Sequence, residues 1–194
     1  MKAPKSVCVY CGSSSRVADV YKDAAHALGE GLARRDIQLV YGGGRVGLMG
    51  IMADAALAAG GSVVGIIPEH IRSAEVEHTG LTELLVVDSM HTRKRLMVDR
   101  SDAFVVLPGG FGTMDEAFEI LTWKQLRLHD KPIVIVDVDG YWRPLLSLVD
   151  HMVAQGFART SHRALFSVVD EVDDVFDTLA HEPEPSLKIR SQKL

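Results

Sequence analysis

Short apolar runs alternate along the chain with longer segments in which apolar residues recur every three or four positions. The short runs are rich in β-branched residues, which is typical of buried strands in a parallel sheet. Strands are predicted at residues 6–11, 38–41, 62–67, 83–87, 103–107, 133–136 and 167–169. The longer segments predict helices at residues 20–35, 47–59, 90–100, 114–126, 141–155 and 172–181.

This alternation predicts an α/β fold, a single Rossmann-like, doubly wound and mostly parallel sheet with helices on both faces. No repeat or linker divides the chain, so we expect one domain over residues 1–181. Residues 182–194 contain two prolines and few apolar residues, and we expect a flexible tail there. In such folds ligands bind where strands end and helices begin, so the loops after the strands are the segments to search.

Composition and charge narrow the function. The 194 residues are 47% hydrophobic and 24% charged, which is typical of a globular domain. Lys and Arg number 21 against 26 Asp and Glu, so no global basic field is available to hold a nucleic acid, and any phosphate must be bound locally. No apolar run approaches the roughly 20 residues of a membrane helix, and no signal peptide is apparent, so we expect a cytoplasmic protein.

The only two cysteines, Cys8 and Cys11, have the spacing of a redox pair or half of a metal site. They fall on a predicted strand, however, where side chains three positions apart point to opposite faces. The eight histidines show no ligand spacing such as His-Glu-x-x-His. We therefore expect no metal ion and no redox role.

A first glycine-rich loop, Gly-Gly-Gly-Arg-Val-Gly at residues 42–47, matches the G-x-G-x-x-G pattern of dinucleotide-binding proteins and lies between a strand and a helix. Glu69 follows at the distance expected of a ribose-binding carboxylate. The dinucleotide pattern belongs after the first strand, however, and here it follows the second. The alternative is that these glycines permit only a tight turn and close helix packing.

A second glycine-rich loop, Pro-Gly-Gly-Phe-Gly-Thr at residues 108–113, also joins a predicted strand to a predicted helix. Without Cβ atoms the backbone can approach an anion closely, and the helix dipole favours negative charge there. No Walker lysine follows Gly112 and Thr113, so we expect one terminal phosphate and not a triphosphate. Two such loops facing one crevice predict a nucleotide clamped from both sides.

Positive charge is concentrated at the start of the helix predicted from Met90. Arg93, Lys94 and Arg95 lie in its first turns, where cations oppose the helix dipole and each other. A bound anion would make this arrangement favourable. The alternative is that these long side chains extend into water.

Glu116 has two interpretations. Thr113 and Glu116 have the spacing of a capping box, in which Glu116 would bond back to the Thr113 amide and do nothing more. Alternatively, Asp115 and Glu116 bring two carboxylates to the helix end expected to hold phosphate, an arrangement that suggests one of them meets another part of the ligand. A carboxylate beside a ribose can stabilise an oxocarbenium-like transition state and activate water.

At these residues the sequence resembles the LONELY GUY (LOG) family of cytokinin riboside 5′-monophosphate phosphoribohydrolases, often labelled "lysine decarboxylase-like" in error. The most specific string is Pro-Gly-Gly-x-Gly-Thr-x-x-Glu at residues 108–116. Further matching strings lie at residues 8–14, 41–44, 47–50, 90–94, 130–132 and 139–141.

The resemblance implies hydrolysis of the N-glycosidic bond of a nucleoside 5′-monophosphate, such as isopentenyladenosine monophosphate or AMP. The products would be the free base and ribose 5-phosphate, with no metal or organic cofactor. Arg93 and Glu116 match the family's catalytic pair. The substrate contacts that the resemblance implies are Glu75, Arg93, Lys94, Gly110, Phe111, Gly112, Thr113, Met114, Asp115, Glu116 and Thr122. It also implies a homodimer or a larger assembly, with sites near subunit contacts.

Three other classes stay open. A non-catalytic nucleotide-binding or carrier protein on the same fold is the main alternative, and it would bind AMP without releasing the base. A dinucleotide oxidoreductase is suggested by residues 42–47, but no hydride-transfer partner is identifiable. A pyridoxal-phosphate decarboxylase is disfavoured because no lysine has a recognisable Schiff-base setting.

Overall fold

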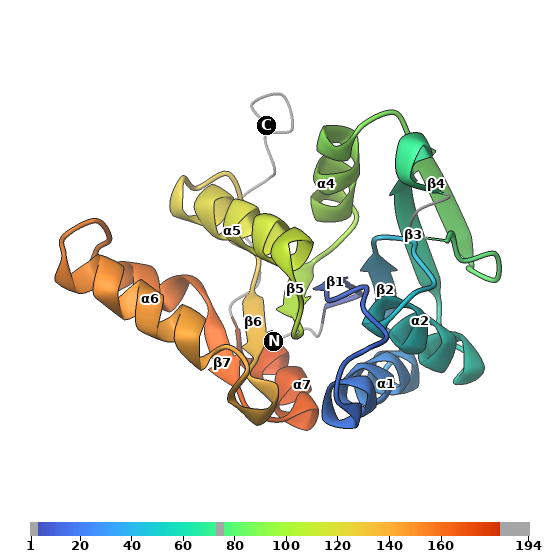
Figure 1. The fold of residues 1–194 in the computed structure, drawn as a ribbon, viewed down its shortest axis with the longest axis horizontal. Coiled ribbons are helices and arrows are strands. Elements are labelled where there is room, and N and C mark those ends of the chain that lie inside the picture. The colour runs from blue at the N-terminus through green and yellow to red at the C-terminus, as the bar shows by residue number, and fades with distance from the viewer. Residues whose placement is uncertain (1–3, 73–75, 183–194) are drawn as a thin grey trace.

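The computed structural model describes residues 4–72 and 76–182. Seven strands form one sheet in the order β4-β3-β2-β1-β5-β6-β7, and every neighbouring pair is parallel (Figure 1). The strands are β1 (Ser6–Tyr10), β2 (Gln38–Tyr41), β3 (Val63–Pro68), β4 (Glu83–Val87), β5 (Ala103–Val106), β6 (Ile133–Val136) and β7 (Ser167–Val169). The α-helices are α1 (Asp19–Arg34), α2 (Leu48–Ala58), α4 (Met90–Asp99), α5 (Phe111–Gln125), α6 (Arg143–Ala154) and α7 (Val172–His181). Short 3-10 helices are η1 (Glu69–Ile71), η2 (Val138–Gly140) and η3 (Thr160–Leu165).

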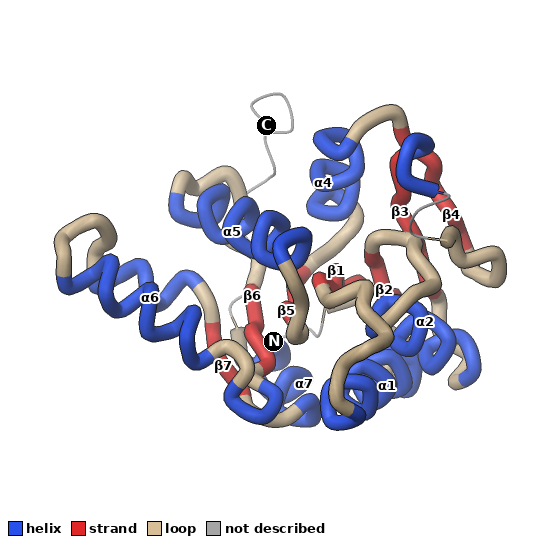
Figure 2. Tube along the Cα trace, viewed as in Figure 1, coloured by secondary structure: helices blue, strands red, loops and turns tan. Residues whose placement is uncertain are grey.

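Helices cover both faces of the sheet (Figures 1 and 2). Because successive strand residues point to opposite faces, β1 contributes Val7 and Val9 to one core and Cys8 and Tyr10 to the other. The first core lies beneath α1, α2 and α7, and the second beneath α4, α5 and the segment that enters α6. The predicted Rossmann-like, doubly wound fold is confirmed, and the described sheet is parallel throughout.

The predicted element boundaries agree with the structure to within three residues, and the largest difference is at α5. This helix begins at Phe111 and not at residue 114, because the glycine-rich segment after Gly110 is already helical. Gly110 is the N-cap and makes no side-chain capping hydrogen bond. Of the two interpretations of Glu116, the capping box is therefore wrong: Thr113 lies inside the first turn of α5, and Glu116 is not the residue that would cap it.

The side chains of the two cysteines point to opposite faces of the sheet, as predicted. Cys8 and Cys11 are both buried and free, and they belong to cores on opposite faces of the sheet. Burial is the largest cause that raises the pKa of both thiols well above the ordinary range. The predicted flexible tail lies outside the described residues, apart from Glu182.

The strand order reverses between β1 and β5. From β1 the chain builds outward through β2, β3 and β4, and from β5 it builds outward on the other side through β6 and β7. The loops after these two central strands therefore diverge, which leaves a crevice at the carboxyl ends of the strands, the usual ligand position in such sheets.

Candidate functional site

Two adjoining cavities lie at this reversal point. The first, the polar cavity, has a volume of about 230 Å³ and is lined by Cys11, Gly12, Ser13, Met49, Met90, Arg93, Gly110, Phe111, Gly112, Thr113, Asp115 and Glu116. The second, the aromatic cavity, has a volume of about 290 Å³ and is lined by Gly12, Ser13, Ser14, Val17, Tyr21, Leu48, Pro108, Gly109, Gly110 and Tyr141. Because they share Gly12, Ser13 and Gly110, they are adjoining parts of one crevice.

The loops after β1 and β5 are bonded to each other at the floor of the crevice. The amide of Gly12 donates to the carbonyl oxygen of Pro108 at 3.0 Å. A Cβ atom at Gly109 would collide with the side chain of Thr113 and approach the amide nitrogen of Gly12 to 2.9 Å. Glycine at position 109 therefore permits the close approach of the two loops on which the shape of both cavities depends.

The amino end of α5 opens into the polar cavity. The first-turn amides of Phe111, Gly112 and Thr113 have no acceptor within the helix, and they carry the positive end of its dipole. A Cβ atom at Gly110 or Gly112 would meet nothing within 4 Å, so the approach to these amides is open. This geometry suits a phosphate group.

Arg93 reaches the polar cavity from α4, and its side chain is buried, with 4% of the residue exposed. Its Nη2 donates to the carbonyl oxygen of Gly42 at 3.0 Å. A Cβ atom at Gly42 would collide with this nitrogen, so the glycine makes room for the guanidinium. The alternative in which Arg93 extends into water is wrong.

Glu116 reaches the same cavity from the second turn of α5 and is half-buried. Burial is the largest cause that raises the pKa of the Cys11 thiol, and the negative charge of the Glu116 carboxylate is the second. The same carboxylate also raises the pKa of Tyr10, after burial and the charge of Cys8. The carboxylate therefore lies near the carboxyl end of β1, at the reversal point. The structure brings together the two residues that the sequence predicted as a catalytic pair, Arg93 and Glu116, from two different helices.

Lys94 is placed differently from the prediction. Its Nζ lies 3.1 Å from Asp115 Oδ2 and 3.1 Å from Glu119 Oε1, and Lys94 is not one of the residues that line the polar cavity. Burial by itself would lower the pKa of Lys94, but the two carboxylates hold it above the ordinary value. Sequence reasoning missed Glu119, although its spacing of four residues from Asp115 puts both carboxylates on one face of the helix.

Two more predicted contacts, Thr122 and Met114, are not among the residues that line either cavity. Thr122 is exposed on α5, six residues beyond Glu116, and lines neither cavity. Met114 is partly buried and packs on the core beneath α5. Glu75 lies outside the described residues. Phe111 and Asp115 do line the polar cavity, and Phe111 is 93% exposed.

The first glycine loop has a packing role. Beyond the bond from Arg93 to Gly42, the Gly43 carbonyl accepts from the His78 amide at 2.9 Å. Gly47 has a φ of +69°, and a Cβ atom there would collide with the backbone of Ser13. Residues 42–44 line neither of these two cavities, so neither cavity supports the prediction of a nucleotide clamped by both glycine loops.

Two of the sequence strings that match the family, residues 130–132 and 139–141, contain residues that hold the elements of the site in place. The Tyr141 hydroxyl donates to the carbonyl oxygen of Gly109 at 2.7 Å, and its ring packs edge-on against Tyr21. Lys131 is buried and its Nζ donates to the carbonyl oxygens of Val98, at 2.6 Å, and Ser101 at the end of α4. These residues hold the loop after β5 and the helix that carries Arg93.

In residues 4–72 and 76–182, no group of three His, Cys, Asp or Glu side chains is arranged to hold a metal ion. No helix in this part of the chain has the length and apolar content needed to cross a membrane.

Comparison with known proteins gives close relatives. A family model described as "Possible lysine decarboxylase" matches residues 49–179. The cytokinin riboside 5′-monophosphate phosphoribohydrolase of Rhodococcoides fascians is 48% identical over 171 residues, which cover 88% of this chain and 86% of the relative. The protein LOG5 of Arabidopsis thaliana, which has the same functional name, is 43% identical over 180 residues, or 92% of this chain and 79% of the relative.

Among solved structures, the molybdenum cofactor carrier protein of Chlamydomonas reinhardtii superposes with a TM-score of 0.68, covering 91% of this chain and 98% of the other. The sequence identity is 19%, so this likeness concerns the fold alone.

Proposed function

This chain belongs to the family of cytokinin riboside 5′-monophosphate phosphoribohydrolases, and from that premise we propose that it hydrolyses the N-glycosidic bond of nucleoside 5′-monophosphates such as isopentenyladenosine monophosphate or AMP. The products are the free base and ribose 5-phosphate. The observation that carries the proposal is that Arg93 and Glu116 line one cavity together with the open amino end of α5. The description "Possible lysine decarboxylase" does not suit Lys94, which follows Arg93 on α4 and is already paired with two carboxylates.

The 5′-phosphate binds at the amides of Gly110, Gly112 and Thr113. Helix amides and the helix dipole hold a phosphate through several short hydrogen bonds. Glu116 follows Thr113 by one turn of α5. Because helical side chains slope toward the amino end of their helix, its carboxylate reaches back beside the phosphate-binding turn. A ribose attached to the phosphate then presents its anomeric carbon to Glu116.

Glu116 is the catalytic carboxylate in this proposal. As the bond from C1′ to the base nitrogen breaks, its electron pair leaves with the base and positive charge develops on the ribosyl ring. The Glu116 carboxylate stabilises that charge, orients a water molecule toward C1′ and accepts a proton from it. The new bond from C1′ to oxygen completes ribose 5-phosphate, and the proton taken from water passes through solvent to the departed base, which returns Glu116 to its carboxylate form.

Arg93 positions the ligand and assists departure of the base. A guanidinium stays protonated and only donates hydrogen bonds, so it acts by stabilising the negative charge that develops on the leaving base. Its hydrogen bond to Gly42 fixes one edge of the guanidinium before substrate arrives. The guanidinium therefore does not have to change position as the transition state forms.

Further substrate contacts are proposed at Phe111 and Asp115, which line the polar cavity. The contacts implied at Lys94, Met114 and Thr122 would require these side chains to move from their positions in this structure, and Glu75 lies outside the described residues.

We also propose a homodimer that acts in the cytosol. Phe111 and Leu126, at the two ends of α5, are 93% and 61% exposed, and burial of such side chains in a subunit contact would be favourable. Two free, buried thiols are typical of a protein from a reducing compartment. Light scattering on the purified protein tests the assembly, with a mass of twice the chain expected.

The activity is tested by incubating the protein with AMP and with isopentenyladenosine monophosphate and separating the products by chromatography. The proposal predicts equal amounts of free base and ribose 5-phosphate. A carrier protein would instead bind AMP and leave the glycosidic bond intact, which would contradict the proposed function.

A further inference from the structure

We propose that Glu119 is a positioning residue of this site. With Asp115 it holds Lys94, and this bridge fixes α5 against α4 and so sets the position of Glu116 relative to Arg93. The inference rests on the proposed function for its effect on catalysis, but the bridge itself is a structural claim that can be tested without any reaction.

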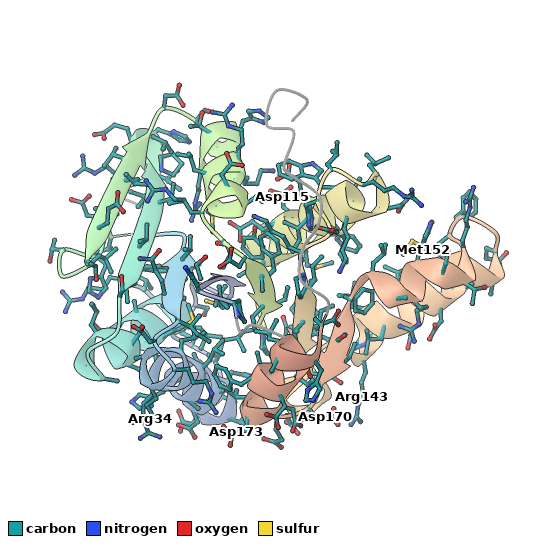
Figure 3. The ribbon with its side chains drawn as sticks, turned by 180° about the vertical axis from the view of Figure 1, so that it is seen from behind. Arg34, Asp115, Arg143, Met152, Asp170 and Asp173 are labelled. Carbon is teal, nitrogen blue, oxygen red and sulfur yellow. The ribbon has the colours of Figure 1, made fainter. Side chains whose placement is uncertain are left out.

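The bridge joins the neighbours of the catalytic pair. Lys94 follows Arg93 on α4, and Asp115 precedes Glu116 on α5. One ammonium group lies 3.1 Å from a carboxylate oxygen of Asp115 and 3.1 Å from one of Glu119. Figure 3 shows Asp115 between α4 and α5, on the side of the molecule away from Arg34.

Glu119 is the better shielded of the two carboxylates. Its side chain is 24% exposed, against 59% for Asp115, and the Lys94 side chain is 16% exposed. Water and salt therefore screen the pair with Glu119 less than the pair with Asp115. The exposed pair of Arg34 and Glu30 on α1, with side chains 68% and 36% exposed, is a useful contrast.

Such a bridge matters because the two helices cover the same face of the sheet but pack on different strands, α4 on β3 and β4 and α5 on β1. Arg93 on α4 is also bonded to Gly42, just after β2, whereas α5 is held on the core by apolar packing, which does not fix its position along the sheet as a hydrogen bond does. A sideways shift of α5 moves Glu116 but leaves the hydrogen bond of Arg93 in place. Reaction rates are sensitive to such shifts, and a displacement of about 1 Å can cost about 100-fold.

Neither Lys94 nor Glu119 lines the polar cavity, so the bridge should affect turnover more than substrate binding. We expect Glu119→Gln to lower kcat with AMP about 10-fold while KM stays within about twofold. Lys94→Met should lower kcat at least as much, and Lys94→Arg should retain most of the activity because a guanidinium can still join both carboxylates. The double variant Lys94→Met, Glu119→Gln should be no worse than Lys94→Met alone, since both remove one interaction.

The matched control is Glu30→Gln, which removes the same charge from an ion pair on α1, on the opposite face of the sheet. It should leave kcat and KM unchanged. The proposal is wrong if Glu119→Gln has full turnover, or if Lys94→Met acts by raising KM alone, because Lys94 would then serve the substrate directly.

Amide hydrogen exchange separates this claim from the proposed function. Glu119→Gln should speed exchange several-fold along α4 and the first turns of α5, and Glu30→Gln should not. Unchanged exchange in both helices would overturn the proposal whether or not the protein is a hydrolase. A wild-type protein that releases no base would overturn the proposed function, while faster exchange in the variant would still support the bridge.

Discussion

The guanidinium of Arg93 donates a hydrogen bond from Nη2 to the carbonyl oxygen of Gly42 at 3.0 Å, across a separation of 51 residues. A charged side chain with only 4% exposure is costly unless its donors are satisfied. The glycine satisfies one donor and, by lacking a side chain, leaves space for the guanidinium. A loop that the sequence suggested as a phosphate site thus holds the guanidinium of Arg93.

Gly42→Ala should reduce activity although Gly42 itself does not line the polar cavity. The added methyl group would collide with Nη2 of Arg93 and displace the guanidinium. We expect kcat/KM with AMP to fall by about 10-fold or more, because a misplaced charge loses most of its effect on the leaving group. Steady-state kinetics measures the loss.

Gly80→Ala is the control for this substitution, since its added carbon comes no closer than 3.3 Å to a neighbouring atom, on the His78 ring. Equal activity of Gly42→Ala and Gly80→Ala would show that the position of Arg93 does not matter.

Gly112→Ala should weaken phosphate binding and leave the fold intact. The new Cβ atom meets no protein atom within 4 Å, and alanine favours helix more than glycine does. Gly112 lines the polar cavity, however, so the methyl group would narrow the approach to the amides at the amino end of α5. We expect the dissociation constant for AMP, measured by calorimetry, to rise about 10-fold with no fall in melting temperature. Unchanged affinity would argue against a phosphate at this turn.

His129 should make stability depend on pH below neutrality. Burial is the main cause that lowers its pKa to about 4, and its Nε2 lies 2.8 Å from the Ile120 carbonyl oxygen while Nδ1 accepts from the Lys131 amide. The ordinary value is about 6.5, so between these pH values the unfolded chain binds a proton that the native protein does not. This contribution is complete above pH about 6.5 and is lost as pH falls toward 4, with a slope of up to about 1.4 kcal/mol per pH unit.

Urea unfolding at a series of pH values measures that slope. His129→Gln retains a donor for the Ile120 carbonyl but cannot take up the proton, so the free energy of unfolding should change less steeply with pH between about 4 and 6.5. Parallel curves for the two proteins would show that His129 is not the group responsible.

The sequence predicted the sheet well because buried parallel strands are short, apolar and separated by helical periodicity. The ends of β2, β4, β6 and β7 agree with the prediction to the residue. The start of α5 was missed because glycine has low helix propensity, and the sequence does not reveal that Phe111 and Gly112 already lie in the helix. That error of three residues is why a capping box at Glu116 was one of the two interpretations.

Within the site, the sequence pattern identified the amino end of α5 and the charges on α4, since both depend on local helix physics. It did not reveal that Lys94 faces Asp115 and Glu119, or that Gly42 accepts from Arg93. Those contacts join elements that are distant in sequence, and they follow from how α4, α5 and β2 pack. Local patterns therefore indicated where the charged residues of the site lie, but not which residues they form ion pairs and hydrogen bonds with.

The most direct test of the account is the turnover of Glu116→Gln with AMP and with isopentenyladenosine monophosphate. The amide keeps the shape of the side chain but carries no negative charge. It can therefore neither stabilise a ribosyl cation electrostatically nor accept a proton from water. We predict that kcat falls by about 100- to 10,000-fold while AMP still binds and the melting temperature is preserved. Turnover close to that of the wild type, with the fold intact, would contradict the assignment of Glu116 as the catalytic carboxylate.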